Sequence, residues 1–212
     1  MRLLSIVFIL FFATLPAFAA ARSVAPAQLS AEQRADLARI ESYLNQLKSV
    51  SARFTQFNDA GEFRYGEIAI KRPGKMRVVY APPENDFIVA DGSFVHVWDA
   101  AMEQQTSMPI GSSVAEFMLR ENIKLEGDVT VTRFERFPAK LEISLVSSKN
   151  PEEGELTLVF EDNPLKLRQW KVLDAQGRLT GVHLENAREG VEFDDNYFNF
   201  VPPNLGKRKS GK

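Results

Sequence analysis

The stretch GEIAIKRPGKMRVVY, residues 66–80, decides the fold. Apolar side chains alternate with other residues on both sides of Pro73-Gly74: Ile68 and Ile70 before it, and Met76, Val78 and Tyr80 after it. Residues two apart on a strand share a face, so each run predicts a strand with one apolar side. Proline interrupts the ladder of a sheet, so the first strand is expected to end at this point.

Working outward, most of the chain repeats this strand pattern. Pairs such as Asp91-Gly92, Gln176-Gly177 and Glu189-Gly190 separate short apolar runs, as hairpin turns do. The strands expected are 62–72, 76–80, 87–90, 94–98, 141–146, 155–160, 165–173, 179–184 and 193–200. Their regular spacing predicts an α+β fold built on one strongly curved antiparallel sheet, a half-open and incomplete β-barrel.

Two helical segments interrupt this series of strands. Ser30 and Gln33 form a capping-box pattern before a helix over residues 31–48, and Ser113 with Glu116 repeats that pattern. Apolar residues at helical spacing are expected to face the sheet and to act as a lid: Ile40, Leu44, Leu47, Phe117 and Met118.

A curved sheet with an apolar concave face must be covered. A few short helices that cover it incompletely would leave an apolar cavity, whereas complete cover would give an ordinary packed core, and the pattern alone leaves both open. If there is a cavity, strand parity assigns its wall to the following residues: Ile68, Ile70, Met76, Val78, Tyr80, Phe87 and Val89.

Arg72 is the charged residue that this parity singles out, because it shares a face with Ile68 and Ile70. A buried guanidinium needs acceptors, and the carbonyl groups at the end of a helix provide them. Pro73 follows directly, which predicts a position at the rim of the sheet. The alternative is an ordinary surface arginine in a turn.

The N-terminus has the features of a secretory signal peptide. Arg2 precedes an apolar run that is shorter than the ~20 residues a membrane helix needs, and Ala17-Phe18-Ala19 is a small-x-small cleavage pattern. No cysteine exists to carry a lipid anchor or a disulfide. We therefore expect a cleaved signal peptide over 1–19, a flexible leader over 20–29, a single domain over 30–205 and a basic tail over 206–212.

The residues required for most enzyme chemistry are missing. The chain has two histidines, His96 and His183, far apart and inside strand patterns, and it has no phosphate-binding loop or nucleophile motif. We expect no catalytic residues, no metal and no cofactor. Without Arg2 and the four basic residues of the tail, 21 basic residues face 28 acidic ones, which argues against binding to nucleic acid.

An ordered series of short motifs resembles the outer-membrane lipoprotein carrier (LolA-like) family. The series includes Phe54-Thr55-Gln56, the segment 66–77, Tyr80-Ala81-Pro82-Pro83, and Phe198-Asn199-Phe200-Val201-Pro202-Pro203. It runs through most of residues 50–203. The chain departs from the family at Met76, which is often phenylalanine there, and at Val78, which replaces an aromatic residue.

The resemblance implies a half-barrel with an α-helical lid over an apolar cavity, and a periplasmic, monomeric carrier of acylated lipoproteins. The partners implied are an ABC-type lipoprotein-releasing complex of the inner membrane and a lipoprotein receptor of the outer membrane. The family's rim arginine falls on Arg72, which would hold the lid closed. Two alternatives are a lipid-sensing or regulatory domain that transfers no cargo, and a periplasmic lipid hydrolase, for which no nucleophile and base are found.

Overall fold

The computed structural model describes residues 24–111, 114–194 and 196–203, with side chains left out at 114–115. These residues form one α-helix, two short 3₁₀ helices and eleven strands. In chain order they are α1 (Ala31–Gln46), β1 (Ser49–Asn58), β2 (Phe63–Lys71), β3 (Lys75–Tyr80), β4 (Phe87–Asp91), β5 (Phe94–Asp99), β6 (Gln104–Pro109), η1 (Val114–Leu119), β7 (Val129–Phe137), β8 (Lys140–Ser147), η2 (Pro151–Glu153), β9 (Gly154–Glu161), β10 (Lys166–Asp174) and β11 (Leu179–Glu189).

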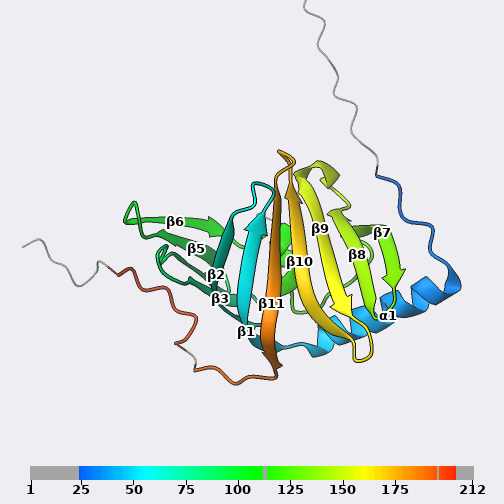
Figure 1. Cartoon of the computed structure of the whole chain (residues 1–212), viewed down its shortest axis with the longest axis horizontal. Helices are drawn as coiled ribbons and strands as arrows, with labels where there is room; N and C mark the ends of the chain where they lie inside the picture. Colours follow the sequence, from blue (N-terminus) through cyan, green and yellow to red (C-terminus); the bar gives the residue numbers. More distant parts are fainter. Residues whose placement is uncertain (1–23, 112–113, 195, 204–212) are drawn as a thin grey trace, which may run out of the picture.

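All the strands belong to a single antiparallel sheet in the order β6-β5-β4-β3-β2-β1-β11-β10-β9-β8-β7. Two meanders, β1–β6 and β7–β11, are joined where β1 pairs with β11. Figure 1 shows β1 and β11 in the middle of the sheet, with β6 and β7 toward its two ends. The single antiparallel sheet with an N-terminal helix that the sequence predicted is confirmed.

The helix α1 begins as its capping box predicted. The Ser30 hydroxyl accepts a hydrogen bond from the backbone N–H of Gln33, and the Gln33 side chain accepts one from the backbone N–H of Ser30. Ile40 and Leu44 are fully buried, so this helix contributes an apolar face to the core. It ends at Gln46, two residues before the predicted end, and Figure 1 shows it crossing beneath β8 and β9.

A cluster of four charged residues attaches the first half of α1 to β7 and to the end of β9: Asp36, Arg39, Arg136 and Asp162. The Asp36 and Asp162 side chains are each 5% exposed. Arg39 contacts Asp36 at 2.6 Å and Asp162 at 2.7 Å, and Arg136 of β7 contacts both carboxylates as well. Two buried negative charges are thus neutralised by two arginines that remain partly in solvent, which satisfies the requirement that buried charges be paired.

The segment 193–200 is not the strand that the sequence predicted. Its backbone turns instead: the N–H of Tyr197 donates to the carbonyl of Asp194, and the N–H of Asn199 donates to that of Asn196. The Asp194 carboxylate also accepts from the N–H of Asn196, a turn that short polar side chains favour over a strand. Phe198 nevertheless remains buried, so the segment packs on the sheet without pairing with it.

Three strands were not among those predicted: β1, β6 and β7. Every residue of β6 is exposed, and β1 and β7 each contain a register shift, at Ser51/Arg53 and at Val131/Arg133. Exposure and bulges both remove the apolar–polar alternation on which strand prediction depends.

Several expectations concern residues outside the described part of the chain, namely the signal peptide over 1–19, the cap at Ser113 and the basic tail over 206–212. Of the leader predicted over 20–29, residues 24–29 are described. There the N–H of Ala27 donates to the carbonyl of Val131 at 2.8 Å, and Ala27 and Leu29 pack against the core.

Replacing Asp36 by alanine should lower the free energy of unfolding by about 3 kcal/mol, because the guanidinium groups of Arg39 and Arg136 each lose a buried carboxylate partner. Glu32→Ala is the matched control: Glu32 also contacts Arg136, at 3.5 Å, but its side chain is 73% exposed. We expect the control to change stability by less than about 1 kcal/mol. Urea denaturation of both variants measures this, and equal losses would contradict the assigned role of the cluster.

Candidate functional site

An apolar cavity of about 230 Å³ lies against the concave face of the sheet. One wall comes from β2–β6, a second from β9 and β10, and η1 covers it. The principal side chains lining the cavity are Ile70, Met76, Val97, Met108, Met118 and Trp170. These side chains carry no formal charge, and the one ionisable residue in the lining, Glu116, belongs to η1.

The cavity shows that the sheet bends around it. Val97 of β5 and Leu156 of β9 both line this space, although β5 and β9 are seven places apart in the strand order. Neighbouring strands are ~4.8 Å apart, so a flat sheet would separate these two strands by roughly 34 Å. The two meanders therefore face each other across the cavity.

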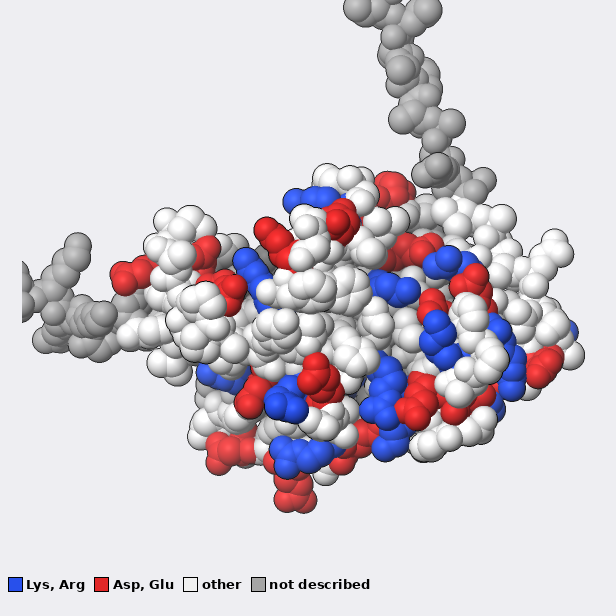
Figure 2. Space-filling view, viewed as in Figure 1, with Lys and Arg blue, Asp and Glu red and all other residues white. Residues whose placement is uncertain are grey.

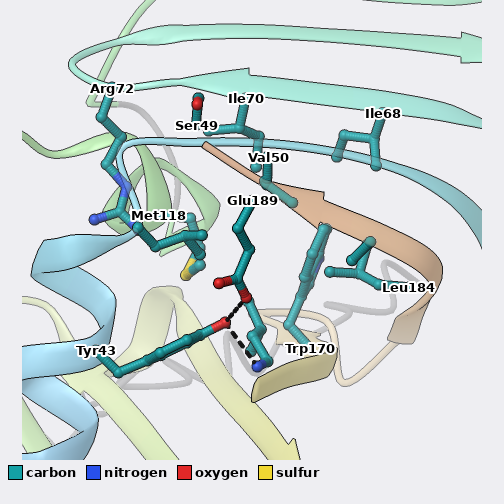
Figure 3. Close-up of a pocket in the computed structure, with 13 residues that line it drawn as sticks. Tyr43, Ser49, Val50, Ile68, Ile70, Arg72, Met118, Trp170, Leu184 and Glu189 are labelled. Carbon is teal, nitrogen blue, oxygen red and sulfur yellow. Dashed lines mark hydrogen bonds between the residues drawn. The ribbon is translucent and has the colours of Figure 1, made fainter. Parts of the chain in front are cut away.

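A second, tighter hollow lies beside the cavity, under the C-terminal turn of α1. Ile70, Met118 and Trp170 line both spaces, so the two adjoin. The room left in the second is only about 10 Å³. Figure 3 shows Tyr43 reaching toward it from α1 and Arg72 extending from the turn after β2 toward α1, with Ile68 and Trp170 on the sheet.

Arg72 joins the sheet to the end of α1. Its Nη1 donates to the carbonyl of Leu44, which belongs to the last turn of the helix, and its backbone N–H donates to the carbonyl of Lys48 at 2.8 Å. The side chain is buried, and no acidic partner is found for it among the residues that the structure describes. The carbonyl end of a helix is partly negative, so it is a suitable site for a cation. The predicted position at a helix end is what the structure shows.

The Arg72 guanidinium is incompletely satisfied in this arrangement. Its Nε is buried and has no hydrogen-bond partner. Burial lowers the pKa of Arg72 to about 10, which leaves the group charged at neutral pH. A buried donor without a partner costs about 1–3 kcal/mol, so the closed arrangement carries a cost along with its hydrogen bond.

The turn that contains Arg72 also bonds to η1. The N–H of Gly74 donates to the carbonyl of Leu119 at 2.8 Å. Gly74 has a φ of +73°, and a Cβ there would lie 2.9 Å from the Cα of Gly92, so the turn requires glycine. Arg72 and Gly74, in one turn, therefore connect the sheet to α1, beside the tighter hollow, and to η1, which covers the cavity.

Tyr43 forms a polar contact at the edge of the tighter hollow. Its hydroxyl donates to the Glu189 carboxylate at 2.7 Å and accepts from the N–H of Leu167 at 3.1 Å (Figure 3). Burial, followed by the neighbouring carboxylate, raises the pKa of Tyr43 well above its usual value. The hydroxyl therefore stays protonated and links α1 to β10 and β11.

The structure brings together some of the residues predicted for the site. Ile68, Ile70, Met76, Leu47 and Met118 line the two hollows. The remaining lid residues, Ile40, Leu44 and Phe117, are buried in the core cluster, as is Val78. Tyr80 packs beside that cluster and donates a hydrogen bond to Gln56.

The assignment of Phe87 and Val89 to the cavity wall is wrong, because both residues lie on the other face of the sheet. Val78 pairs directly with Ile88, and directly paired residues share a face, so it is Ile88 that lines the cavity. Phe87 instead stacks on Trp98 and contacts Phe200. The C-terminal segment covers this outer face and makes its residues as buried as those inside.

Other cavity residues were not assigned to the wall from the sequence. Val95, Val97, Met108, Leu156 and Trp170 come from strands that are distant from residues 66–80. Val95 and Val97 alternate within a predicted strand, so their common face was readable, but nothing in the sequence shows which face of that strand is concave. Met108 belongs to β6, which was not predicted.

The described residues contain no group of three or more metal-binding side chains and no helix long and apolar enough to cross a membrane. Figure 2 shows acidic and basic side chains next to one another on the face in view, without a broad basic surface. Such a surface gives no support for binding to a polyanion.

Comparison with known proteins finds relatives of this chain. The family profile "Outer membrane lipoprotein carrier protein LolA" matches residues 45–201. An outer-membrane lipoprotein carrier protein of Methylococcus capsulatus is 30% identical over 173 residues, which cover 78% of this chain and 83% of that protein. Another, of Alkalilimnicola ehrlichii, is 30% identical over 202 residues, 91% of each chain. The crystal structure of a LolA superfamily protein of Nitrosomonas europaea superposes with a TM-score of 0.44 at 10% identity, covering 77% of this chain and 97% of that one.

A sheet bent around an apolar cavity and covered by η1 can hold an apolar ligand. The chain belongs to the LolA family of outer-membrane lipoprotein carrier proteins. The family is periplasmic, serves lipoprotein transport and outer-membrane biogenesis, and is not enzymatic. The family resemblance and the non-enzymatic role predicted from the sequence are confirmed.

Val97→Phe should fill part of the cavity. We expect it to weaken binding of the apolar fluorophore N-phenyl-1-naphthylamine by about tenfold, while stability changes by less than ~1.5 kcal/mol because the added ring enters empty space. Val79→Phe is the control, since Val79 lies on the outer face and is 40% exposed. Fluorescence titration measures both, and equal binding by the two variants would show that the cavity is not the binding site.

Proposed function

We propose that this protein binds the acyl chains of lipoproteins in its cavity and carries them across the periplasm. It receives them from an ABC-type releasing complex in the inner membrane and delivers them to a receptor in the outer membrane. The observation that carries the proposal is an apolar cavity with an adjoining hollow, in which η1 over the first and α1 over the second are bonded to one turn of the sheet, through Gly74 and Arg72.

The dimensions of the cavity support a carrier that opens. Pockets that enclose a drug-sized ligand usually measure about 300–1,000 Å³. At about 230 Å³ the cavity is smaller than this, so a lipid with more than one acyl chain requires the covering helices to move. Each methylene removed from water contributes ~0.8 kcal/mol, which supplies the free energy for that movement.

The bonds of Arg72 suit a cover that opens and closes. A hydrogen bond from a charged donor contributes ~1.5–3 kcal/mol, while the unpaired Nε offsets part of that gain. The closed state is therefore favoured by a modest margin. Cargo can overcome such a margin when it binds, and closure helps to expel the cargo at the receptor.

The second candidate is a lid-covered domain that senses lipids without transferring cargo. Both functions use the same cavity, so the distinction rests on delivery to a second membrane. Export through a signal peptide cleaved after Ala19 is part of the carrier proposal, as is a monomeric mature protein. N-terminal sequencing of the periplasmic fraction tests the cleavage site, and a retained Met1 would contradict it.

Arg72→Leu should separate loading from delivery. The substitution removes the hydrogen bond to Leu44 and adds apolar wall, so the loaded state is favoured by roughly tenfold to a thousandfold. The variant should take lipoproteins from washed inner membranes and fail to pass them to outer-membrane vesicles. Arg72→Lys should be intermediate, because an ammonium group keeps the charge without the geometry of the guanidinium.

The control is Arg53→Leu, which makes the same chemical change at an exposed position of β1. It should load and deliver like the unaltered protein. Quantifying the lipoprotein on both membranes after incubation gives loading and delivery separately. Normal delivery by Arg72→Leu would remove the assigned role of Arg72, and delivery by no form of the protein would favour the sensing domain.

A further inference from the structure

Among the strands that the structure describes, β6 is an edge strand without a neighbour on its outer side. It is the last strand in the order, and all six of its residues are exposed. Natural edge strands are usually protected by charged side chains, bulges or an internal proline. The six residues of β6, QQTSMP, contain no charge, its register with β5 is continuous, and its one proline is the last residue.

The pairing with β5 shows which backbone groups point outward. The N–H of Ile110 donates to the carbonyl of Ser93, and Phe94 pairs with Pro109 in the same register. In an antiparallel ladder this makes Phe94–Pro109 a non-hydrogen-bonded pair, and such pairs recur at every second position. The N–H and C=O groups of Gln105 and Ser107 are therefore directed away from β5, toward the free edge.

The opposite edge strand of the sheet, β7, carries charged side chains and is covered by other segments of the chain. The strand β7 carries Arg133, Glu135 and Arg136, and the leader runs along it, with the N–H of Ala27 donating to the carbonyl of Val131. The Gln33 side chain also donates to the carbonyl of Phe134. Of the two edges, then, β7 is charged and covered, whereas no described strand pairs with the outer side of β6.

The open edge is continuous with the cavity. Met108 and Pro109 of β6 line the cavity, together with Gly111 just beyond the strand. A chain that leaves the cavity on this side passes directly along β6. The edge and the cavity are therefore two parts of one surface, the first rich in hydrogen-bonding groups and the second apolar.

We propose that the edge of β6 binds the polypeptide that follows the acylated residue of a lipoprotein, as an added β-strand. The inference rests on the proposed function, because it takes the acyl chains to occupy the cavity. The polypeptide contributes backbone N–H and C=O groups, which pair with those of Gln105 and Ser107. Its acylated end stays at Met108 and Pro109, next to the cavity.

Recognition of this kind depends on the main chain rather than on a particular sequence. The outward-pointing backbone belongs to residues with short or uncharged side chains, which impose little selection on the cargo. The five residues Gln104–Met108 at ~3.3 Å each span roughly 17 Å, so this part of the edge accommodates a segment of about five residues. The strand thus binds the polypeptide of the cargo, and the cavity binds its acyl chains.

The test compares two synthetic ligands: a diacylglyceryl-cysteine peptide that extends about eight residues beyond the cysteine, enough to span the strand, and the same diacylglyceryl-cysteine as a simple amide. Ser107→Pro removes one outward N–H and leaves the bonds to β5, since proline is tolerated on the solvent side of an edge strand. Ser107→Ala is the control for the lost hydroxyl, which contacts His96 and Gln105.

We expect Ser107→Pro to bind the peptide ligand about tenfold more weakly and the amide as tightly as the unaltered protein does, while Ser107→Ala changes neither. A peptide methylated on alternate backbone nitrogens should show the same weakening with the unaltered protein. Equal affinity for the methylated and unmethylated peptides would overturn the proposal, whatever the proline variant does. If the unaltered protein bound neither the peptide ligand nor the amide, the proposed function itself would fail, and the inference with it.

Discussion

The hydrogen bond from Arg72 to the carbonyl of Leu44 joins the sheet to the last turn of α1, and the proposed opening and closing of the protein depends on it. It arises because the alternation of β2, continued to Arg72, directs a guanidinium toward the apolar side, where the end of a helix offers an acceptor. The same turn continues through Gly74 to Leu119 of η1. A short turn is therefore bonded to both helical elements, and the Nε of Arg72 has no hydrogen-bond partner in this arrangement.

The first half of α1 is attached to the sheet by buried ion pairs. Asp36 and Asp162 are buried and paired with arginines, far along the helix from Leu44. Tyr43 and Asn45 add bonds to β10, β11 and Ile123. Among the described residues, η1 has its backbone bond to Gly74 and longer ion pairs of 3.9 Å from Arg120 to Glu116 and Asp128. Within the described part of the chain, α1 and η1 thus differ in the polar bonds that attach them, while both bury apolar side chains in the core.

Strand parity predicted the cavity wall where one face of a strand is apolar and failed where both faces are. In β2 and β3 the alternation is clear, and Ile68, Ile70 and Met76 lie where it placed them. The run of residues 87–90 is apolar throughout, because the C-terminal segment buries the outer face of β4 through Phe200. A strand buried on both sides has no readable parity, so Phe87 and Val89 were assigned to the wrong face. That segment was itself mistaken for a strand.

By itself the sequence determined the helix and its cap, most of the strands, and the direction of Arg72, because each follows from residues a few positions apart. It also determined the family, through motifs spread over most of the chain. Only the tertiary structure decided that Leu44 accepts the bond, that Val97 and Leu156 face each other across a cavity, and which sheet edge stays open. These features depend on how far the sheet bends and on which segments pack over its faces, and contacts between distant residues leave no periodic trace in the sequence.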